Sequence, residues 1–184
     1  MRLFIAVKCD EKLNGLVFKS GKMLENFGLI KPVEFENLHI TLAFLGDQKE
    51  ENHKKIIDCI ETAKIQENIF VVFKKFNYFE RNGIPSVFFL EGESNSLVSF
   101  TNDLRKKLKE KKIFFDDKKK FIIHLTVARI KRLTDKKGFK DYIVRLNEDF
   151  KPYKAHIKTV YLFKSILTQH GPIYEQIYAK ELNC

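Results

Sequence analysis

The chain contains two short segments, separated by the 85 positions from His39 to His124, that carry nearly the same residues in the same order. They are residues 39–43, which read HITLA, and residues 124–128, which read HLTVA. Apolar and β-branched residues favour a strand here, and side chains two positions apart on a strand leave the same face, about 6.6 Å apart along the chain. The repeat therefore predicts two similar lobes, each presenting one His and one Thr from the face of a strand.

Two imidazoles and two hydroxyls that face a shared cleft are suited to acid–base chemistry on a phosphate ester. One neutral imidazole can take a proton from water while a protonated one gives a proton to the departing alkoxide, and no metal is needed. Each threonine hydroxyl can donate a hydrogen bond to a non-bridging phosphate oxygen. We therefore predict that His39 and His124 are catalytic and that Thr41 and Thr126 bind the phosphate.

Arg129 is the third candidate for phosphate binding, because a guanidinium can take up charge that accumulates on the phosphoryl group. It follows His124 by five residues, and this odd spacing places it on the opposite face of an ideal strand. Its reach into the site therefore requires a β-bulge, a strand end or a side chain that bends round.

A metal site is another interpretation of paired histidines. Neither repeated segment contains Cys, Asp or Glu, and Thr is a poor ligand for zinc. Cys9, Cys59 and Cys184 are scattered and lack the paired spacing of a zinc site or a disulfide-rich domain. We therefore expect reduced thiols, no metal and no cofactor.

The charge balance is strongly basic, with 34 Lys and Arg against 24 Asp and Glu and a net charge of +10. Such a surface attracts polyanions, so it supports a nucleic-acid partner without establishing one. Residues 106–120 are especially rich in lysine. This basic segment is either a solvated helix face and loop or a track for RNA phosphates.

The N-terminus lacks the long apolar stretch of a signal peptide, and no window approaches 18 apolar residues. We expect a monomer in the cytoplasm with no membrane partner. With 184 residues, of which 44% are apolar, the chain can bury one good core.

Hydrophobic periodicity and capping residues predict an α+β fold with mainly antiparallel sheets, outer helices and a central cleft. Residues 1–184 are expected to form a single domain of two similar lobes, the first ending near residue 91. Turns are predicted at residues 31–32 and 81–83, with a break at residues 136–138. The expected strands are residues 3–7, 38–45, 69–79, 86–91, 121–130, 155–167 and 173–180. The expected helices are residues 11–27, 50–64, 95–111 and 140–147, and Asp10 is the expected N-cap of the first.

The chain resembles the 2H phosphoesterases, and within them the RNA 2′,3′-cyclic phosphodiesterases first described as 2′-5′ RNA ligases. The residues that carry the resemblance run the length of the chain. They are the opening MRLFIA, the two signatures HITLAFLG and HLTVAR that begin at His39 and His124, and the closing segments 165–167 and 171–174. One departure is Ile123, where the family often has Pro before the second His.

The resemblance implies a bilobal fold with pseudo-twofold symmetry and a cleft where the two signatures meet. It also implies metal-independent hydrolysis of an RNA 2′,3′-cyclic phosphate end to a 2′-phosphomonoester, with the five residues predicted above in the site. Our hypothesis is that His124 acts as the base on water and His39 as the acid on the departing O3′. The reversed assignment stays open, because the pairing requires only that one His be neutral and the other protonated.

Two alternatives remain besides this hydrolase. One is a 2′-5′ RNA ligase acting on tRNA halves, which would use the same site in the reverse direction. The other is a non-catalytic RNA- or nucleotide-binding module, although a pure binder does not need two titratable groups in matched positions. The expected partner is RNA with a 2′,3′-cyclic phosphate end, including tRNA fragments, or a related nucleotide. His170, beside the 171–172 turn, is a further candidate for lining the cleft, whereas Phe44 and Leu45 are expected in the core.

Overall fold

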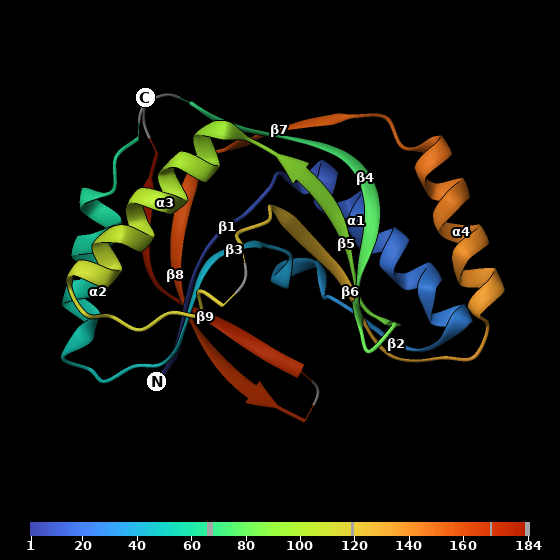
Figure 1. Ribbon diagram of the computed structural model, residues 1–184, viewed down its shortest axis with the longest axis horizontal. Helices are drawn as coiled ribbons and strands as arrows, with labels where there is room; N and C mark the ends of the chain where they lie inside the picture. The colour runs from blue at the N-terminus through green and yellow to red at the C-terminus, as the bar shows by residue number, and fades with distance from the viewer. Residues whose placement is uncertain (66–67, 119, 170, 183–184) are drawn as a thin grey trace.

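A computed structural model of the chain describes residues 1–65, 68–118, 120–169 and 171–182 (Figure 1). Its helices are α1 (Glu11–Met23), α2 (Asn52–Thr62), α3 (Asn95–Glu110) and α4 (Lys136–Asp149), with 3-10 helices at Leu24–Phe27 and Phe35–Asn37. Its strands are β1 (Arg2–Val7), β2 (Gly28–Pro32), β3 (Ile40–Asp47), β4 (Ile69–Arg81), β5 (Ile84–Glu93), β6 (His124–Leu133), β7 (Tyr153–Ile157), β8 (Thr159–Thr168) and β9 (Gly171–Glu181).

The strands form two sheets that meet along the middle of the molecule. The first sheet has the strand order β3-β1-β8-β9 and the second has the order β2-β6-β5-β4-β7. Neighbouring strands within each sheet are antiparallel. Helices α2 and α3 lie outside the first sheet, and helices α1 and α4 lie outside the second (Figure 1). This arrangement confirms the predicted α+β fold with antiparallel sheets and outer helices.

The lobes, however, are not successive halves of the chain. Strands β4 and β5, which the sequence analysis assigned to the first lobe, pair with β7 and β6 in the second sheet. Strand β2 also belongs to the second sheet, although it lies between β1 and β3 in the sequence. The prediction was wrong because periodicity identifies a strand and its buried face but carries no information about which distant strand pairs with it.

Two predicted breaks lie inside regular elements. Pro32, predicted in a turn, ends β2 and pairs with Ala128 of β6. Because β2 is the edge strand of its sheet, the missing N–H of proline is tolerated there. Gly138, predicted as part of a break, lies in the first turn of α4 and donates its N–H to the Oδ1 of Asp135 at 2.8 Å. A Cβ on Gly138 would lie 2.2 Å from that carboxylate, so glycine permits this cap.

Other local predictions are confirmed. Asp10 caps α1 by accepting the N–H of Leu13 at 2.9 Å. Residues 82 and 83 form the two-residue turn between β4 and β5, with φ angles of 54° and 73°. An Asn-Gly pair is favoured where both central residues of a hairpin turn need positive φ.

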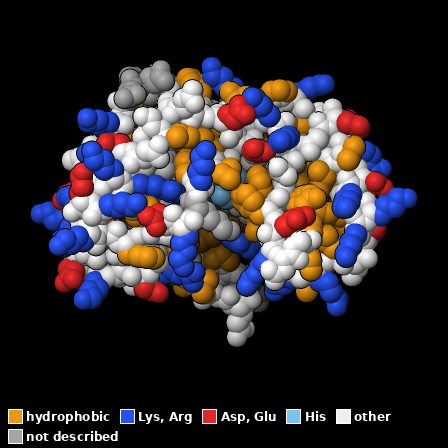
Figure 2. All heavy atoms as spheres, in the orientation of Figure 1, with side chains coloured by type: hydrophobic (Ala, Val, Ile, Leu, Met, Phe, Trp, Pro, Cys, Tyr) orange, Lys and Arg blue, Asp and Glu red, His pale blue; other side chains and the backbone are white. Residues whose placement is uncertain are grey.

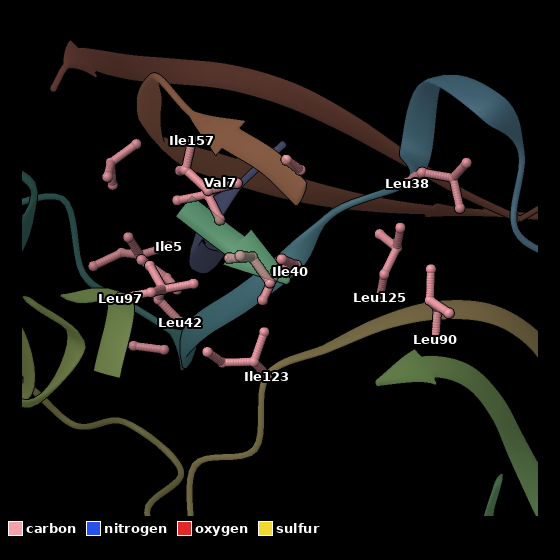
Figure 3. Close-up of a cluster of buried hydrophobic side chains, with 14 of the residues drawn as sticks. Ile5, Val7, Leu38, Ile40, Leu42, Leu90, Leu97, Ile123, Leu125 and Ile157 are labelled. Carbon is pink, nitrogen blue, oxygen red and sulfur yellow. The ribbon is translucent and has the colours of Figure 1, made fainter. Parts of the chain in front are cut away.

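One hydrophobic cluster includes buried side chains of both sheets. Figure 3 shows part of it, with Ile5, Val7 and Ile40 from the first sheet in the same cluster as Leu90 and Leu125 from the second. The signature strands β3 and β6 both contribute to this core, so the core holds the two sheets together. Within the described ranges, no helix is both long enough and apolar enough to span a membrane.

Candidate active site

Strand β6 contains a β-bulge directly after Thr126. Thr126 pairs with Phe89 of β5. Ala128 pairs with the adjacent Phe88, so Val127 is an extra residue with no partner opposite it. A bulge of this kind bends the strand and re-aims the side chains that follow it.

The bulge brings Arg129 onto the face of β6 that carries His124 and Thr126. Before the bulge the odd-numbered residues are buried, and after it the even-numbered residues are buried as far as Ile130. Val127 lies on the helix side, because a Cβ added to Gly21 of α1 would meet its Cγ1 at 3.1 Å. The structure therefore supplies the irregularity that the odd spacing of Arg129 requires, and the role of Arg129 in binding phosphate stays a prediction.

Strand β3 carries the same irregularity directly after Thr41. Thr41 pairs with Ala6 of β1, and Leu42 is the extra residue before the pairing resumes at Ala43. The side chain of Phe44 consequently takes the position on β3 that Arg129 takes on β6. The two signatures thus repeat a backbone geometry as well as a residue pattern.

The bulge in β3 also explains why Phe44 is not in the main core, where the sequence analysis placed it. Phe44 is half-buried and packs in a second, smaller cluster with Phe4 and Phe163. The guanidinium of Arg2 lies 5.1 Å from the centre of its ring. Leu45, by contrast, is fully buried in the main core, as predicted.

Both histidines use the same backbone contact to orient their rings. The Nδ1 of His39 lies 2.7 Å from the carbonyl oxygen of Asn37, and the Nδ1 of His124 lies 2.7 Å from that of Ile122. A carbonyl oxygen only accepts, so in each neutral ring Nδ1 carries the hydrogen. Nε2 is therefore the nitrogen left available for proton transfer in both residues.

Aromatic side chains flank each imidazole. The ring centre of His39 lies 5.0 Å from that of Phe4 and 5.3 Å from that of Tyr174, which it meets edge to face. The ring centre of His124 lies 5.3 Å from that of Phe79 and 5.5 Å from that of Phe89, also edge to face. These contacts restrict ring rotation, so the backbone bond and the packing together hold each Nε2 in one direction.

The two Nε2 atoms differ in their own contacts. The Nε2 of His39 lies 3.0 Å from the Oγ1 of Thr41, two residues along the same face. In the described parts of the chain, no hydrogen-bond partner lies within reach of the Nε2 of His124. Thr126 is half-buried on the same face of β6 as His124.

The pKa of His39 is lowered to about 4, chiefly by burial; the hydrogen bond to the Asn37 carbonyl acts in the opposite direction, and the neighbouring charges of Lys8, Arg129 and His124 add to the lowering. Burial also lowers the pKa of His124, and the charge of Arg129 acts in the same direction. Both rings are therefore neutral at pH 7 in the free protein. The influence of Arg129 on both pKa values shows that the structure brings His39, His124 and Arg129 together.

The depressed pKa of His39 leads to a prediction for stability. Between pH 4 and 6.5 the unfolded chain binds a proton at this position that the folded chain does not. The free energy of unfolding should therefore fall as the pH falls through this window and should be fully recovered above it. The measurement is urea unfolding at a series of pH values. The free energy of unfolding should depend less steeply on pH in His39→Gln than in the wild type, and the difference in slope should correspond to at most about one bound proton. The control is Thr41→Val, which keeps the imidazole, and an unchanged slope in His39→Gln would contradict the prediction.

Figure 2 shows a hollow in the middle of one face of the molecule, with histidine atoms inside it and apolar and basic side chains around it. The basic residues that act on the site include two that the sequence analysis missed. Lys8 lowers the pKa of His39, and Arg2 lowers that of Tyr174, which burial raises. The signal for both was their position: they flank the apolar run of residues 3–7 at even-numbered positions, which share a strand face with Phe4, and Phe4 packs against His39.

In the basic segment 106–120, by contrast, four lysines are paired with nearby carboxylates. Lys109 lies 2.8 Å from Asp117, and Lys111 lies 3.3 Å from Asp58. Lys106 and Lys107 are paired with Glu110 and Asp103 on α3 itself, at 3.9 Å and 3.7 Å. These pairs favour the interpretation of this segment as a solvated face.

No cluster of three or more His, Cys, Asp and Glu side chains suited to a metal ion occurs among residues 1–65, 68–118, 120–169 and 171–182. His170, a sequence-based candidate for the cleft, lies outside the described residues.

A sequence model described as the 2′-5′ RNA ligase superfamily matches residues 24–167, which include both signatures. The chain belongs to this superfamily. The resemblance to the 2H phosphoesterases that the paired signatures predicted is thereby confirmed.

Members of the superfamily and related structures align over almost the whole chain. A protein of Methanocaldococcus jannaschii named RNA 2′,3′-cyclic phosphodiesterase is 36% identical over 182 residues, which cover 96% of this chain and 98% of that protein. The crystal structure of TT0787 of Thermus thermophilus has a TM-score of 0.82 at 24% identity and covers 99% of this chain and 98% of its own. The crystal structure of E. coli LigT complexed with 3′-AMP has a TM-score of 0.75 at 19% identity, covering 100% and 98%. These structures confirm the predicted bilobal fold.

Proposed function

We propose that this enzyme hydrolyses the 2′,3′-cyclic phosphate at an RNA 3′ end to a 2′-phosphomonoester, without a metal ion. The observation that carries the proposal is the matched orientation of two imidazoles, each held through Nδ1 by a backbone carbonyl, with one guanidinium close to both. The relative from M. jannaschii, which aligns over 98% of its length, carries the name of this activity.

In the proposed reaction, His124 acts as the general base. Its Nε2 takes a proton from a water molecule, and the water oxygen forms a new bond to phosphorus as the bond from phosphorus to O3′ breaks. The lone pair of this nitrogen is not engaged by any side chain or backbone group in the described residues, which suits it to accept that proton.

His39 acts as the general acid and gives its Nε2 proton to the departing O3′. Because its pKa is about 4 in the free protein, His39 must gain this proton together with the substrate. The negative charge of a bound phosphodiester favours the charged imidazolium and raises its pKa. Substrate binding and proton uptake are therefore coupled in this mechanism.

Arg129, Thr41 and Thr126 hold the phosphate between the two rings. The guanidinium of Arg129 stabilises the charge that develops on the non-bridging oxygens, and the two hydroxyls donate hydrogen bonds to them. All five side chains come from one chain, so the proposed site is complete in a monomer. We propose RNA ends, including those of tRNA fragments, as the substrates in the cytoplasm.

The test is to incubate the protein with an RNA that ends in a 2′,3′-cyclic phosphate in the presence of EDTA. The expected product is the 2′-phosphomonoester, identified by mass and by comparison with synthetic 2′- and 3′-phosphate standards. A 3′-phosphate would contradict the assignment of O3′ as the leaving group. Activity that EDTA abolishes and a divalent cation restores would contradict the metal-free mechanism.

A further inference from the structure

The bulge in β3 is held by a side chain of helix α3. The guanidinium of Arg105 donates two hydrogen bonds to the carbonyl oxygen of Leu42, from Nε at 2.9 Å and from Nη2 at 2.7 Å. Leu42 is the extra residue of the bulge that directly follows Thr41.

In the matching bulge of β6, the carbonyl oxygen of the extra residue has a different hydrogen-bond partner. There the carbonyl oxygen of Val127 accepts the backbone N–H of Val33 at 2.9 Å, just beyond the end of β2. Strand β3 is the edge strand of its sheet, and among the described residues β1 is the strand that pairs with it. A buried backbone carbonyl needs a partner, and on this side Arg105 supplies it.

Arg105 also contacts the chain that leads into the second signature. Its guanidinium lies 4.9 Å from the ring centre of Phe121 and 5.6 Å from that of Phe115. Phe121 precedes Ile122, whose carbonyl oxygen orients His124. The half-buried Arg105 therefore touches both the bulge that follows the first His-x-Thr pair and the segment that fixes the second histidine.

We propose that Arg105 is a positioning residue that sets the place of the first His-x-Thr pair relative to His124, an inference that rests on the function proposed above. It acts through the Leu42 carbonyl and the Phe121 ring and does not touch the substrate. Its loss should therefore lower kcat and leave KM nearly unchanged, because the groups that bind the phosphate are all retained. A misplacement of about 1 Å in such a site can lower the rate about 10²-fold.

The test compares Arg105→Met, Arg105→Lys and Lys106→Met. Methionine keeps an apolar stem against the two Phe rings but cannot donate to the Leu42 carbonyl, whereas lysine can donate one hydrogen bond. Lys106 is the neighbouring residue on α3, and its ammonium pairs with Glu110, so Lys106→Met removes one positive charge without touching either signature.

We expect kcat for the cyclic phosphate to fall about 10- to 100-fold in Arg105→Met with KM within about twofold, to recover partly in Arg105→Lys, and to stay unchanged in Lys106→Met. Equal losses in Arg105→Met and Lys106→Met would overturn the proposal. If Arg105→Met does not fold, Arg105→Lys takes its place in the comparison. Replacing the guanidinium with an ammonium must then still lower kcat more than Lys106→Met does.

NMR titration of the histidine rings provides a readout that does not depend on turnover. If Arg105 positions the signatures, the titration of His39 or His124 in the free protein should shift in Arg105→Met and stay in place in Lys106→Met. Unchanged titrations in both variants would overturn the inference even if kcat fell. Shifted titrations in a protein whose wild type does not open the cyclic phosphate would refute the proposed function and leave the positioning role standing.

Discussion

Replacing His124 or His39 with alanine should lower kcat for opening a 2′,3′-cyclic phosphate by about 10²- to 10⁴-fold, the usual contribution of one general acid or base. Neither change removes a group proposed to bind the phosphate, so the affinity for a non-hydrolysable RNA end should change little. The measurements are steady-state kinetics and equilibrium binding on the same preparations. Turnover that persists unchanged in both variants would refute the two-histidine mechanism.

The two histidines can be told apart with a substrate in which sulfur replaces O3′. A thiolate leaves without needing a proton, so the general acid loses its importance for this substrate. His39→Ala should therefore recover much of its activity on the sulfur substrate, and His124→Ala should not. The opposite result would establish the reversed assignment, in which His39 is the base.

Replacing Arg129 with glutamine should lower kcat by about 10²- to 10³-fold, as expected for one donor that stabilises charge in the transition state. The reason is geometric as well as electrostatic, because the bulge at Val127 turns Arg129 toward the face of His124. Arg129→Lys should restore only part of the loss, since an ammonium cannot form the paired hydrogen bonds of a guanidinium.

The matched control for Arg129 is Arg145→Gln on helix α4, an exposed arginine on the outer side of the second sheet. It removes the same charge far from the signatures, so kcat should stay at the wild-type value. Equal losses at both positions would mean that overall charge, and not the placement of Arg129, controls the rate. Measuring kcat and KM of both variants at two salt concentrations separates long-range attraction of the substrate from direct contact with Arg129, because salt screens the long-range attraction.

Local features of the fold were predictable because neighbouring residues determine them. The Asp10 cap and the Asn82-Gly83 turn are examples, since each depends on residues within one turn of the chain. The pairing of β5 with β6 was not predictable, because strand partners are chosen by long-range packing that one sequence does not display. Pro32 was misassigned for the same reason: only its place at a sheet edge makes a strand acceptable there.

The candidate site follows a similar division. The repeated His and Thr residues could be found from spacing, and the odd position of Arg129 already implied an irregular strand. The companion bulge at Leu42 left no such signal, so Phe44 was assigned to the core. Arg105 directly precedes the lysine-rich segment 106–120, and nothing in its local sequence indicates that it reaches a distant backbone carbonyl.

The alternation of the strands between the sheets has a consequence for motion. The backbone passes from one sheet to the other four times, between β1 and β2, β2 and β3, β3 and β4, and β7 and β8. Two lobes joined by one linker can rotate about a single hinge. Here the two sheets are joined by four backbone connections, and all four would have to bend together. We therefore expect the two histidines to keep nearly the same separation in the free and the substrate-bound protein.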